Sequence, residues 1–183
     1  QLRAARVSGD TYCRTDSHWN HRGAFVGYHH LMESLALPPL AEAAVQFHEQ
    51  SLAGDLGGRF KPAYSAPTTY AKIVNPRAKL ISDNKANNRG RIIVYEHSDS
   101  KLPRCVFFGD SFSMRMIPFL AESFSRLVLV PQANIDFDLV DEERPDVVIA
   151  EMVERFLIKI PDDLRSPPAR ELAQVKGPIE ARH

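Results

Sequence analysis

Cys105-Val106-Phe107-Phe108-Gly109-Asp110-Ser111 is the most informative segment for the fold. Its first four residues form a short continuous apolar run, the pattern of a strand that is buried on both faces of a sheet. The run passes directly into Gly-Asp-Ser, and a helical stretch follows over roughly 113–125. Similar apolar runs occur at Leu127–Val130 and Val147–Ala150, with a polar connection over 131–145 between them. This alternation is typical of a parallel sheet with crossover connections, so the sequence predicts an α/β fold.

The remaining elements are predicted from local signals. Asn20 is a suitable N-cap for a helix from about His21 to Leu37. Pro118 predicts that the regular part of the 113–125 helix begins only near Ile117, because proline in a helix interior costs about 3 kcal/mol. Further expected elements are a weaker helix at Leu40–Ser51 and strands at Thr68–Val74, Ala78–Ile81 and Arg91–Glu96.

Length and composition limit the number of domains and the kinds of partner that the chain can have. With 183 residues, 44% of them apolar, we expect one domain over 1–160 and then a polar, Pro-rich tail over 161–183 that packs poorly. The 23 basic and 23 acidic residues balance, so no nucleic-acid partner is expected. No apolar run approaches the roughly 18 residues of a membrane span. The chain opens with Gln1 and not Met, so we expect the amino-terminal part of the native chain to be missing.

Ser111 is a candidate nucleophile. Sites in open parallel sheets form beyond the carboxyl ends of the strands, which places Ser111 at the rim of the sheet. Gly109 allows a tight turn, and the backbone N–H groups that follow could bind an oxyanion. The competing interpretation is a simple turn, because Gly, Asp and Ser dominate turns for local hydrogen-bonding reasons.

Asp16 and His18 form a second candidate group. If the segment is extended, the two side chains lie on the same face, and a carboxylate beside an imidazole can fix its tautomer. A loop in which Asp16 bonds only backbone is one alternative. Metal binding by Asp16, His18 and His21 is another, but ligand spacing is absent elsewhere, so no metal site is expected. Cys13 and Cys105 could pair or stay reduced.

Several further segments accompany these two groups in the same order. They are Tyr12 to Asn20 with Gly23-Ala24, Gly54-Asp55-Leu56, Leu102-Pro103 leading to Phe108-Gly109-Asp110-Ser111-Phe112, and Pro145 to Ile149 leading to Glu154-Arg155. In this combination the chain resembles the SGNH hydrolase-like domain of the alginate O-acetyltransferase family, whose members O-acetylate bacterial exopolysaccharides.

The resemblance implies a three-layer α/β/α fold of SGNH or flavodoxin-like type with a mostly parallel central sheet. It makes Ser111 the nucleophile, His18 the general base and Asp16 its orienting carboxylate. The Asp-x-His pair precedes the serine, which is the permuted order of this family. The resemblance also implies a periplasmic or cell-envelope location, a polysaccharide acceptor, an acetyl donor, possible contacts with exopolysaccharide secretion proteins, and no cofactor.

Substrate contacts are assigned with less direct support. The usual SGNH oxyanion donors have no evident motif, and Asn134 is the stand-in, with a surface-turn asparagine as the alternative. Tyr12 and Trp19 flank the Asp-His pair and could stack on a sugar ring, although core packing is the commoner use of tryptophan. Two other functions stay open: a carbohydrate or small-ester acetylesterase with the same triad, and a non-catalytic polysaccharide-binding or secretion-complex module.

Overall fold

The structure is a computed structural model that describes residues 2–158 and 161–176. The chain forms two compact units: unit 1 lies within residues 2–76 and 114–120, and unit 2 within 77–113 and 121–176. Predictions for 159–160 and for 177–183, the last part of the expected tail, lie outside the described residues.

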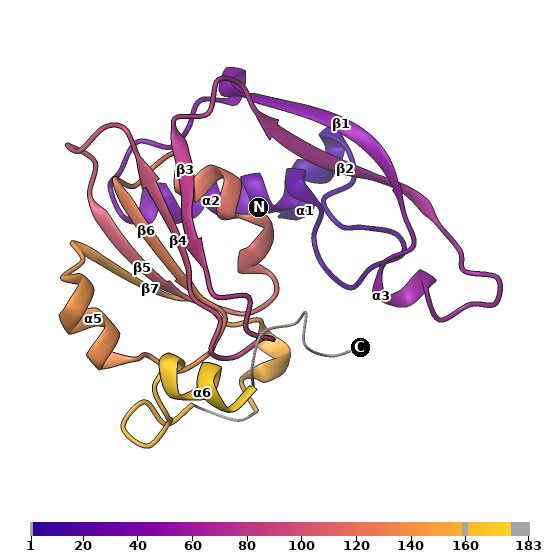
Figure 1. Ribbon diagram of the computed structural model, residues 1–183. Coiled ribbons are helices and arrows are strands. Elements are labelled where there is room, and N and C mark those ends of the chain that lie inside the picture. The colour runs from indigo at the N-terminus through magenta and orange to yellow at the C-terminus, as the bar shows by residue number, and fades with distance from the viewer. Residues whose placement is uncertain (1, 159–160, 177–183) are drawn as a thin grey trace. The chain divides into compact units, whose positions relative to one another are not determined.

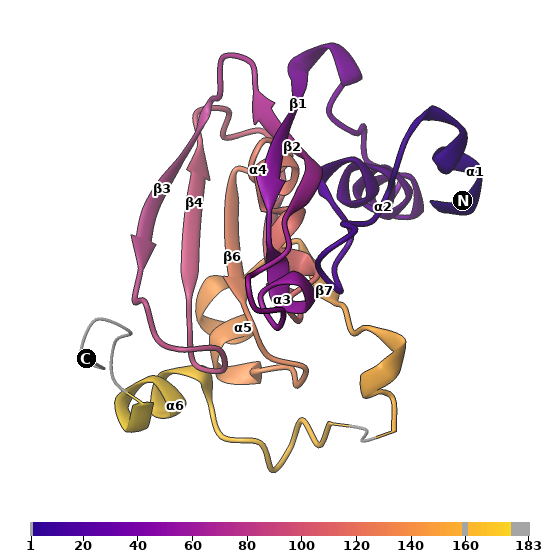
Figure 2. The same cartoon turned by 90° about the vertical axis from the view of Figure 1, so that its right-hand side faces the viewer.

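Unit 1 is built around one long helix and a two-stranded ribbon (Figure 2). Strands β1 and β2 pair antiparallel from Val45↔Ile73 to Leu52↔Ala66. Its elements in chain order are α1 (Leu2–Ala5), η1 (Arg6–Ser8), α2 (His21–Ser34), η2 (Glu42–Ala44), β1 (Val45–Leu52), α3 (Gly54–Gly57) and β2 (Ala66–Ile73). The helix predicted at Leu40–Ser51 is therefore wrong, because an eight-residue ladder with a distant strand outweighs a weak local helical preference.

Helix α2 begins where the sequence predicts. The Asn20 side chain accepts the Gly23 N–H at 3.0 Å, which caps the first turn, and the helix ends at Ser34, three residues earlier than expected. Its buried face includes Phe25 and Tyr28, and the ring of Phe119 lies 5.0 Å from that of Phe25. This face anchors α2 within unit 1.

Unit 2 contains a five-stranded sheet in the order β3-β4-β6-β5-β7 (Figure 1). Strands β6, β5 and β7 are parallel, as predicted, whereas β4 runs antiparallel to both β3 and β6. The strands are β3 (Ala78–Asp83), β4 (Ile93–His97), β5 (Arg104–Phe108), β6 (Arg126–Val130) and β7 (Val147–Ala150). The shorter elements are η3 (Ser113–Arg115), α4 (Ile117–Ala121), which spans the boundary of the two units, α5 (Phe137–Glu143), η4 (Glu154–Phe156) and α6 (Ala169–Lys176).

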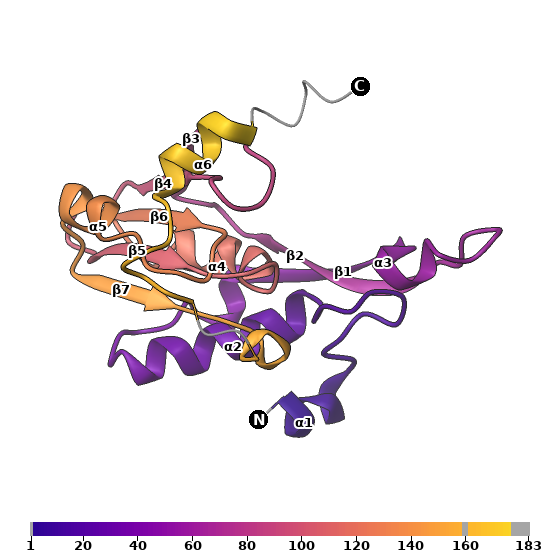
Figure 3. The same cartoon turned by 90° about the horizontal axis from the view of Figure 1, so that it is seen from below.

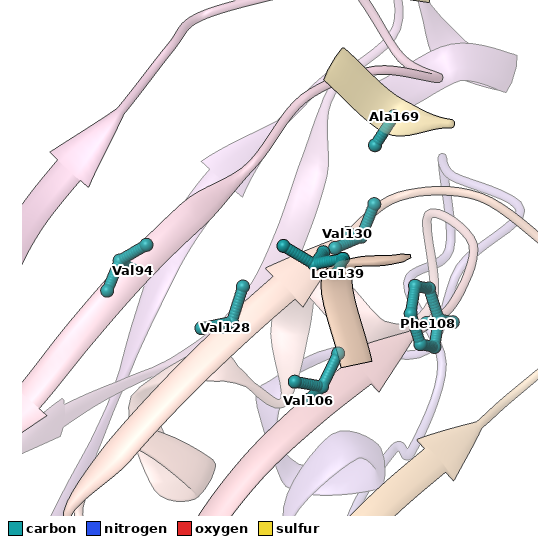
Figure 4. Close-up of a cluster of buried hydrophobic side chains, with 7 residues drawn as sticks. All are labelled: Val94, Val106, Phe108, Val128, Val130, Leu139 and Ala169. Atoms are coloured by element: carbon teal, nitrogen blue, oxygen red, sulfur yellow. The ribbon is translucent and has the colours of Figure 1, made fainter. Parts of the chain in front are cut away.

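One face of this sheet packs against α5 (Figure 4). Leu139 of α5 meets Val106 and Phe108 of β5 in a buried cluster that also holds Val94, Val128, Val130 and Ala169. Helix α5 lies inside the polar connection predicted over 131–145, for which no helix was predicted. Its single buried leucine gives too weak a periodic signal for detection, although Asp136 caps it by accepting the Leu139 N–H at 3.2 Å.

The first part of the expected tail is packed and not loose. Ala169 is fully buried in the cluster, and its N–H donates to Asp136 Oδ2 at 2.7 Å. Helix α6 lies beside the β3–β4 connection (Figure 3), where a Cβ on Gly90 would sit 2.7 Å from the Ala173 nitrogen. The prediction of poor packing from Pro161 onward is thus wrong for the start of α6. The segment is polar in composition, but its Ala169 side chain packs in the buried cluster.

None of the helices in residues 2–158 and 161–176 combines the length and the apolar character needed to cross a bilayer.

Candidate active site

The Asp16–His18 pair lies at the tip of a hairpin-like loop in unit 1. Tyr12 and Trp19 face each other in an antiparallel bridge, and the Cys13 N–H donates to the His18 carbonyl at 3.1 Å. Asp16 Oδ1 then lies 2.6 Å from His18 Nδ1 and also accepts the His18 backbone N–H at 2.9 Å. The structure therefore brings together the two side chains that the Asp-x-His spacing predicted on one face.

This contact determines the tautomer of His18. An ionised carboxylate only accepts hydrogen bonds, so Nδ1 carries the proton that it shares with Asp16. The second ring nitrogen, Nε2, is consequently the one with a lone pair that can take a proton from a substrate or a nucleophile. The pair is mostly shielded, with side-chain exposures of 18% for His18 and 11% for Asp16, which strengthens the contact relative to a surface pair.

A short helix holds the loop from the other side. Asp55 of α3 accepts the Ser17 N–H at 2.7 Å and the Ser17 hydroxyl at 2.6 Å. The N–H groups of Leu56 and Gly57 both donate to the Thr15 carbonyl, at 3.1 and 2.9 Å. The hydroxyl of Ser17 holds the pKa of Asp55 below its usual range, so Asp55 is a stable anionic tether for the loop.

Arg115 supplies positive charge to the same loop. Its guanidinium Nη2 lies 3.7 Å from Asp16 Oδ2, the carboxylate oxygen that does not contact His18. Both side chains are largely buried, and Arg115 follows Ser111 by four residues in the chain. Arg115 therefore places a positive charge beside the carboxylate that orients His18.

The alternative metal site does not have the predicted composition. Asp16, His18 and Asp55 place one donor atom each within 4.8 Å of one another. His21, the third predicted ligand, instead packs its ring against Tyr70 with centroids 5.3 Å apart, and burial lowers its pKa to about 4. Both oxygens of Asp55 already accept hydrogen bonds from Ser17, which suits a structural tether better than a cation ligand.

Ser111 lies in unit 2, in the turn that follows β5, and is exposed. Asp110 shapes this turn, because its Oδ1 accepts the Phe112 N–H and its Oδ2 accepts the Val153 N–H, both at 2.8 Å. Gly109 is needed for space: a Cβ there would lie 2.7 Å from the Phe107 ring and 2.8 Å from Ser113 Oγ. The turn is thus tied to the segment after β7 and admits no larger residue at its start.

Glu151 is a second acid at this turn that the sequence analysis did not identify. It follows β7 directly, its Oε2 accepts the Asp110 N–H at 3.2 Å, and its own N–H donates to the Phe108 carbonyl at 2.8 Å. Burial, and then the negative charge of Asp110, raise the pKa of Glu151 to about 7. Its place at the carboxyl end of a predicted strand is the signal that could have found it.

Asn134 lies four residues beyond the end of β6, in the same unit as Ser111. Strand β6 is parallel to β5, and the Gly109 N–H donates to the Val130 carbonyl at 3.1 Å. The segment with Ser111 and the segment with Asn134 therefore both begin at the carboxyl ends of these neighbouring strands. Asn134 is buried, with 2% exposed, and its Oδ1 accepts from Arg89 Nη2 at 3.3 Å. The alternative of an exposed surface-turn asparagine is therefore wrong, while its role as an oxyanion donor stays a prediction.

The two predicted sugar-stacking residues have different surroundings in unit 1. Tyr12 is 45% exposed and lines a pocket of about 320 Å³ together with Arg14, Glu49 and Thr69. The Trp19 ring packs on α2, close enough that a Cβ on Gly27 would lie 3.0 Å from it.

The two cysteines are free and buried. Cys13 Sγ accepts from the Thr68 hydroxyl at 3.0 Å in unit 1, and Cys105 lies within β5 of unit 2. Burial raises the pKa of both thiols, so they are poor nucleophiles.

The structure thus joins Asp16 to His18 in unit 1 and places Ser111 and Asn134 at one edge of unit 2. The meeting of Ser111 with His18 stays a prediction. Asp55 was part of a segment noted in the sequence but not given a role, and nothing in the sequence singled out Arg115.

A serine in the turn after a parallel core strand of an α/β sheet is the arrangement expected of an SGNH hydrolase-like protein, and Ser111 after β5 has it. Comparison with protein families identifies the chain more closely: it belongs to the family described as SGNH hydrolase-like domain, acetyltransferase AlgX, which matches residues 1–133. Comparison with curated proteins finds no match.

Solved structures with this fold share little sequence with the chain. Bacillus cereus PatB1, also known with a sulfonyl adduct, has a TM-score of 0.65 at 18% identity over 85% of this chain and 66% of its own. A DHHW family protein from Eubacterium siraeum has a TM-score of 0.63 at 16% identity, covering 94% and 66%. The O-acetyltransferase domain of Pseudomonas putida AlgJ has a TM-score of 0.53 at 19% identity, covering 96% and 64%. The chain spans less than two thirds of each of these relatives.

Proposed function

We propose that the chain is an O-acetyltransferase that modifies a bacterial exopolysaccharide through Ser111, His18 and Asp16. The observation that carries the proposal is the 2.6 Å contact between His18 Nδ1 and Asp16 Oδ1, which prepares Nε2 to act as a general base. The exposed Ser111 at a strand end and membership of the AlgX acetyltransferase family support the same chemistry.

In the first step His18 Nε2 removes the hydroxyl proton of Ser111 while Ser111 Oγ attacks the carbonyl carbon of an acetyl donor. The backbone N–H of Ser111 stabilises the negative charge that develops on the carbonyl oxygen. When the tetrahedral intermediate collapses, the bond to the leaving group breaks and the leaving group takes the proton from His18. The product is acetyl-Ser111.

In the second step a sugar hydroxyl replaces the leaving group. His18 Nε2 takes its proton, the sugar oxygen attacks the acetyl carbon, and the bond to Ser111 Oγ breaks as Ser111 recovers the proton. Asp16 stabilises the imidazolium that forms in both steps. Both steps are acid–base and acyl-transfer chemistry, which side chains perform without a cofactor.

The acceptor side of the proposal rests on the pocket in unit 1. Its lining mixes acidic, basic and hydroxyl side chains with the exposed ring of Tyr12, a composition suited to sugar hydroxyls and a sugar face. We assign Tyr12 to this acceptor site. A polysaccharide acceptor also implies work in the periplasm or at the cell envelope, beside the proteins that export the polymer.

Covalent labelling tests the proposal. We expect a sulfonyl fluoride to modify Ser111, as PatB1 is known with a sulfonyl adduct, and peptide mass spectrometry locates the label. Ser111→Ala and His18→Ala should abolish labelling, while Ser34→Ala, an exposed serine on α2, should retain it. A native chain that never labels would favour the non-catalytic binding module.

Product analysis separates transferase from esterase. With acetyl-Ser111 formed from p-nitrophenyl acetate, we expect the acetyl group on an added oligosaccharide in preference to free acetate. If water stays the productive acceptor for every oligosaccharide, the chain is an acetylesterase with the same triad.

A further inference from the structure

Two carboxyl groups join the turn that carries Ser111 to the segment after β7. Asp110 Oδ2 accepts the Val153 N–H at 2.8 Å, and in the opposite direction Glu151 Oε2 accepts the Asp110 N–H at 3.2 Å. The Glu151 N–H also donates to the Phe108 carbonyl at 2.8 Å. The reaction proposed above uses neither carboxyl group, although Asp110 directly precedes the nucleophile.

Asp110 holds both peptide groups of Ser111. Its Oδ1 accepts the Phe112 N–H at 2.8 Å, which fixes the peptide group after Ser111. Its carbonyl oxygen accepts the Ser113 hydroxyl at 2.7 Å, which fixes the peptide group before Ser111. The N–H of that first peptide group is the one expected to stabilise the oxyanion. A shift of the Asp110 side chain would therefore misplace both this N–H and Ser111 Oγ.

Glu151 exchanges a proton with solvent near neutral pH. Burial, the negative charge of Asp110 and a hydrogen bond to the Asp110 side chain together raise the pKa of Glu151 to about 7. As a neutral acid, Glu151 accepts the Asp110 N–H and donates its own proton to the Asp110 side chain. When that proton passes to solvent, the donated hydrogen bond is lost and two negative charges face each other. The Asp110 side chain is then repelled, together with the backbone that it holds.

The other charged groups beside the turn belong to η4. Glu154 and Arg155 are both exposed, and the Arg155 guanidinium lies 5.7 Å from the centre of the Phe112 ring. Water screens these exposed charges, whereas Asp110 acts on Glu151 within a half-buried site. The charge that opposes ionisation of Glu151 is therefore that of Asp110.

We propose that Glu151 is a positioning residue for the nucleophile: while protonated it holds Asp110, and through it Ser111, in the reactive position, and its ionisation slows acylation. The inference rests on the proposed function, because it requires Ser111 to be the nucleophile. Glu151 acts through Asp110 and not on the reacting atoms, so its proton passes to solvent and it forms no bond with a substrate. Acylation then requires two protonation states at once, a neutral His18 that accepts a proton and a neutral Glu151 that keeps one. The rate of acylation should rise and then fall with increasing pH.

Glu151→Gln separates ionisation from loss of the side chain. The amide has the size of the acid, can accept the Asp110 N–H and donate to the Asp110 side chain, and does not titrate. We expect the rate of sulfonyl labelling of Ser111 in the variant, divided by the rate in the wild type, to be close to unity at pH 6. The ratio should rise to about five- to thirtyfold at pH 8.5, because the protonated fraction of an acid with a pKa of about 7 falls about thirtyfold over this range. Titration of His18 and hydrolysis of the reagent affect both chains equally, so they cancel in the ratio.

Glu154→Gln is the matched control, because it removes an exposed carboxylate from the same segment after β7 and should reproduce the wild-type pH profile. Glu151→Ala removes both hydrogen bonds to Asp110 and should lower the labelling rate at every pH, by about fivefold or more. Rates are compared over the pH range in which the circular dichroism of each chain is unchanged, so that they report on the turn and not on unfolding.

A ratio of Glu151→Gln to wild type that stays constant with pH overturns the inference, as does a Glu154→Gln profile that matches that of Glu151→Gln. The wild-type chain at pH 6 separates this failure from failure of the proposed function. Labelling of Ser111 at pH 6 with a constant ratio retains the acetyltransferase chemistry and removes the role of Glu151. No labelling of Ser111 at pH 6 removes the proposed function, and the role of Glu151 with it.

Discussion

His18 Nδ1 and the His18 backbone nitrogen share one oxygen of Asp16, at 2.6 and 2.9 Å. Asp16, two residues before His18, thus fixes the orientation of the histidine ring and its tautomer. Arg115 binds the other oxygen of the same carboxylate, so that Asp16 has a separate partner on each side. The orientation of the proposed base is therefore encoded almost entirely within three consecutive residues.

Asp16→Asn tests this orientation. In the variant, a single amide atom at the position of Oδ1 faces both Nδ1 and the backbone N–H of His18. An amide nitrogen there donates to Nδ1 and leaves the proton on Nε2, the wrong tautomer for a base, whereas an amide oxygen there carries no full negative charge to stabilise the imidazolium. In serine proteases the equivalent change lowers the rate by about 10⁴, and we expect a fall of about 10³ to 10⁴ in p-nitrophenol release. Asp141→Asn, an exposed acid on α5, is the control. An unchanged rate in Asp16→Asn would reduce Asp16 to a loop-forming role.

Asp55 is predicted to act through Ser17 alone. We expect Ser17→Ala and Asp55→Ala each to lower the acylation rate about three- to tenfold, because the loop that carries His18 loses its tether. The acylation rate of the double variant should equal that of the slower single variant. Because the low pKa of Asp55 keeps it ionised from about pH 5 upward, the effect should be the same across that range.

Rates measured in all four chains complete this cycle. Effects of Ser17→Ala and Asp55→Ala that multiply would mean that Asp55 has a function independent of Ser17, such as direct contact with a substrate.

Gly54 is predicted to be irreplaceable in α3. Its φ is +59°, and a Cβ would overlap the Thr15 carbonyl oxygen and lie 2.6 Å from Asp16 Cβ. We expect Gly54→Ala to destabilise the chain by about 2 kcal/mol or more in urea unfolding, with a loss of acylation. Gly58→Ala is the comparison, since Gly58 has φ −66° and a Cβ would meet only the Gly54 oxygen, at 3.1 Å. It should change stability by less than about 1 kcal/mol, and equal effects at the two glycines would refute the steric argument.

The correct predictions from sequence rest on local signals. The apolar runs at β5, β6 and β7 place strands within one residue. For β5 and β6 the reason is burial inside the sheet, which demands continuous apolar residues, whereas β7 is an edge strand in which only Ile149 is buried. Asn20 and the start of regular helix at Ile117, one residue before Pro118, give two helix ends for equally local reasons.

The missed features depend on partners far away in the chain. Strand β1 forms because it pairs along its whole length with β2. The packing of α6 depends on the hydrogen bond between the Ala169 N–H and Asp136, which lies 33 residues upstream. In the site, Asp55 binds Ser17 across 38 positions, and Glu151 binds Asp110 across 41. Only the Asp-x-His pair and the Gly-Asp-Ser turn carry their chemistry in adjacent residues, which is why the sequence identified them and not their supports.

Glu151 is expected to make stability depend on pH. In the unfolded chain its carboxyl has an ordinary pKa near 4.5, whereas in the folded chain the pKa is about 7. Between these values the folded state keeps a proton that the unfolded state has released, so ionisation opposes folding. The contribution of Glu151 to the stability of the wild-type chain should therefore fall as the pH rises from about 4.5 to about 7, and it should be constant above that.

Glu151→Gln removes this titration while keeping an oxygen that can accept the Asp110 N–H. We expect urea unfolding to show the variant gaining about 1 to 3 kcal/mol over the wild type between pH 5 and pH 8. Histidines also titrate in this range, but they are the same in both chains, so they cancel in the difference. Glu142→Gln, which removes an exposed acid paired with Arg170, controls for loss of a carboxylate and should show little change with pH. Parallel stability curves for wild type and Glu151→Gln would mean that Glu151 ionises normally and that Asp110 does not oppose its charge.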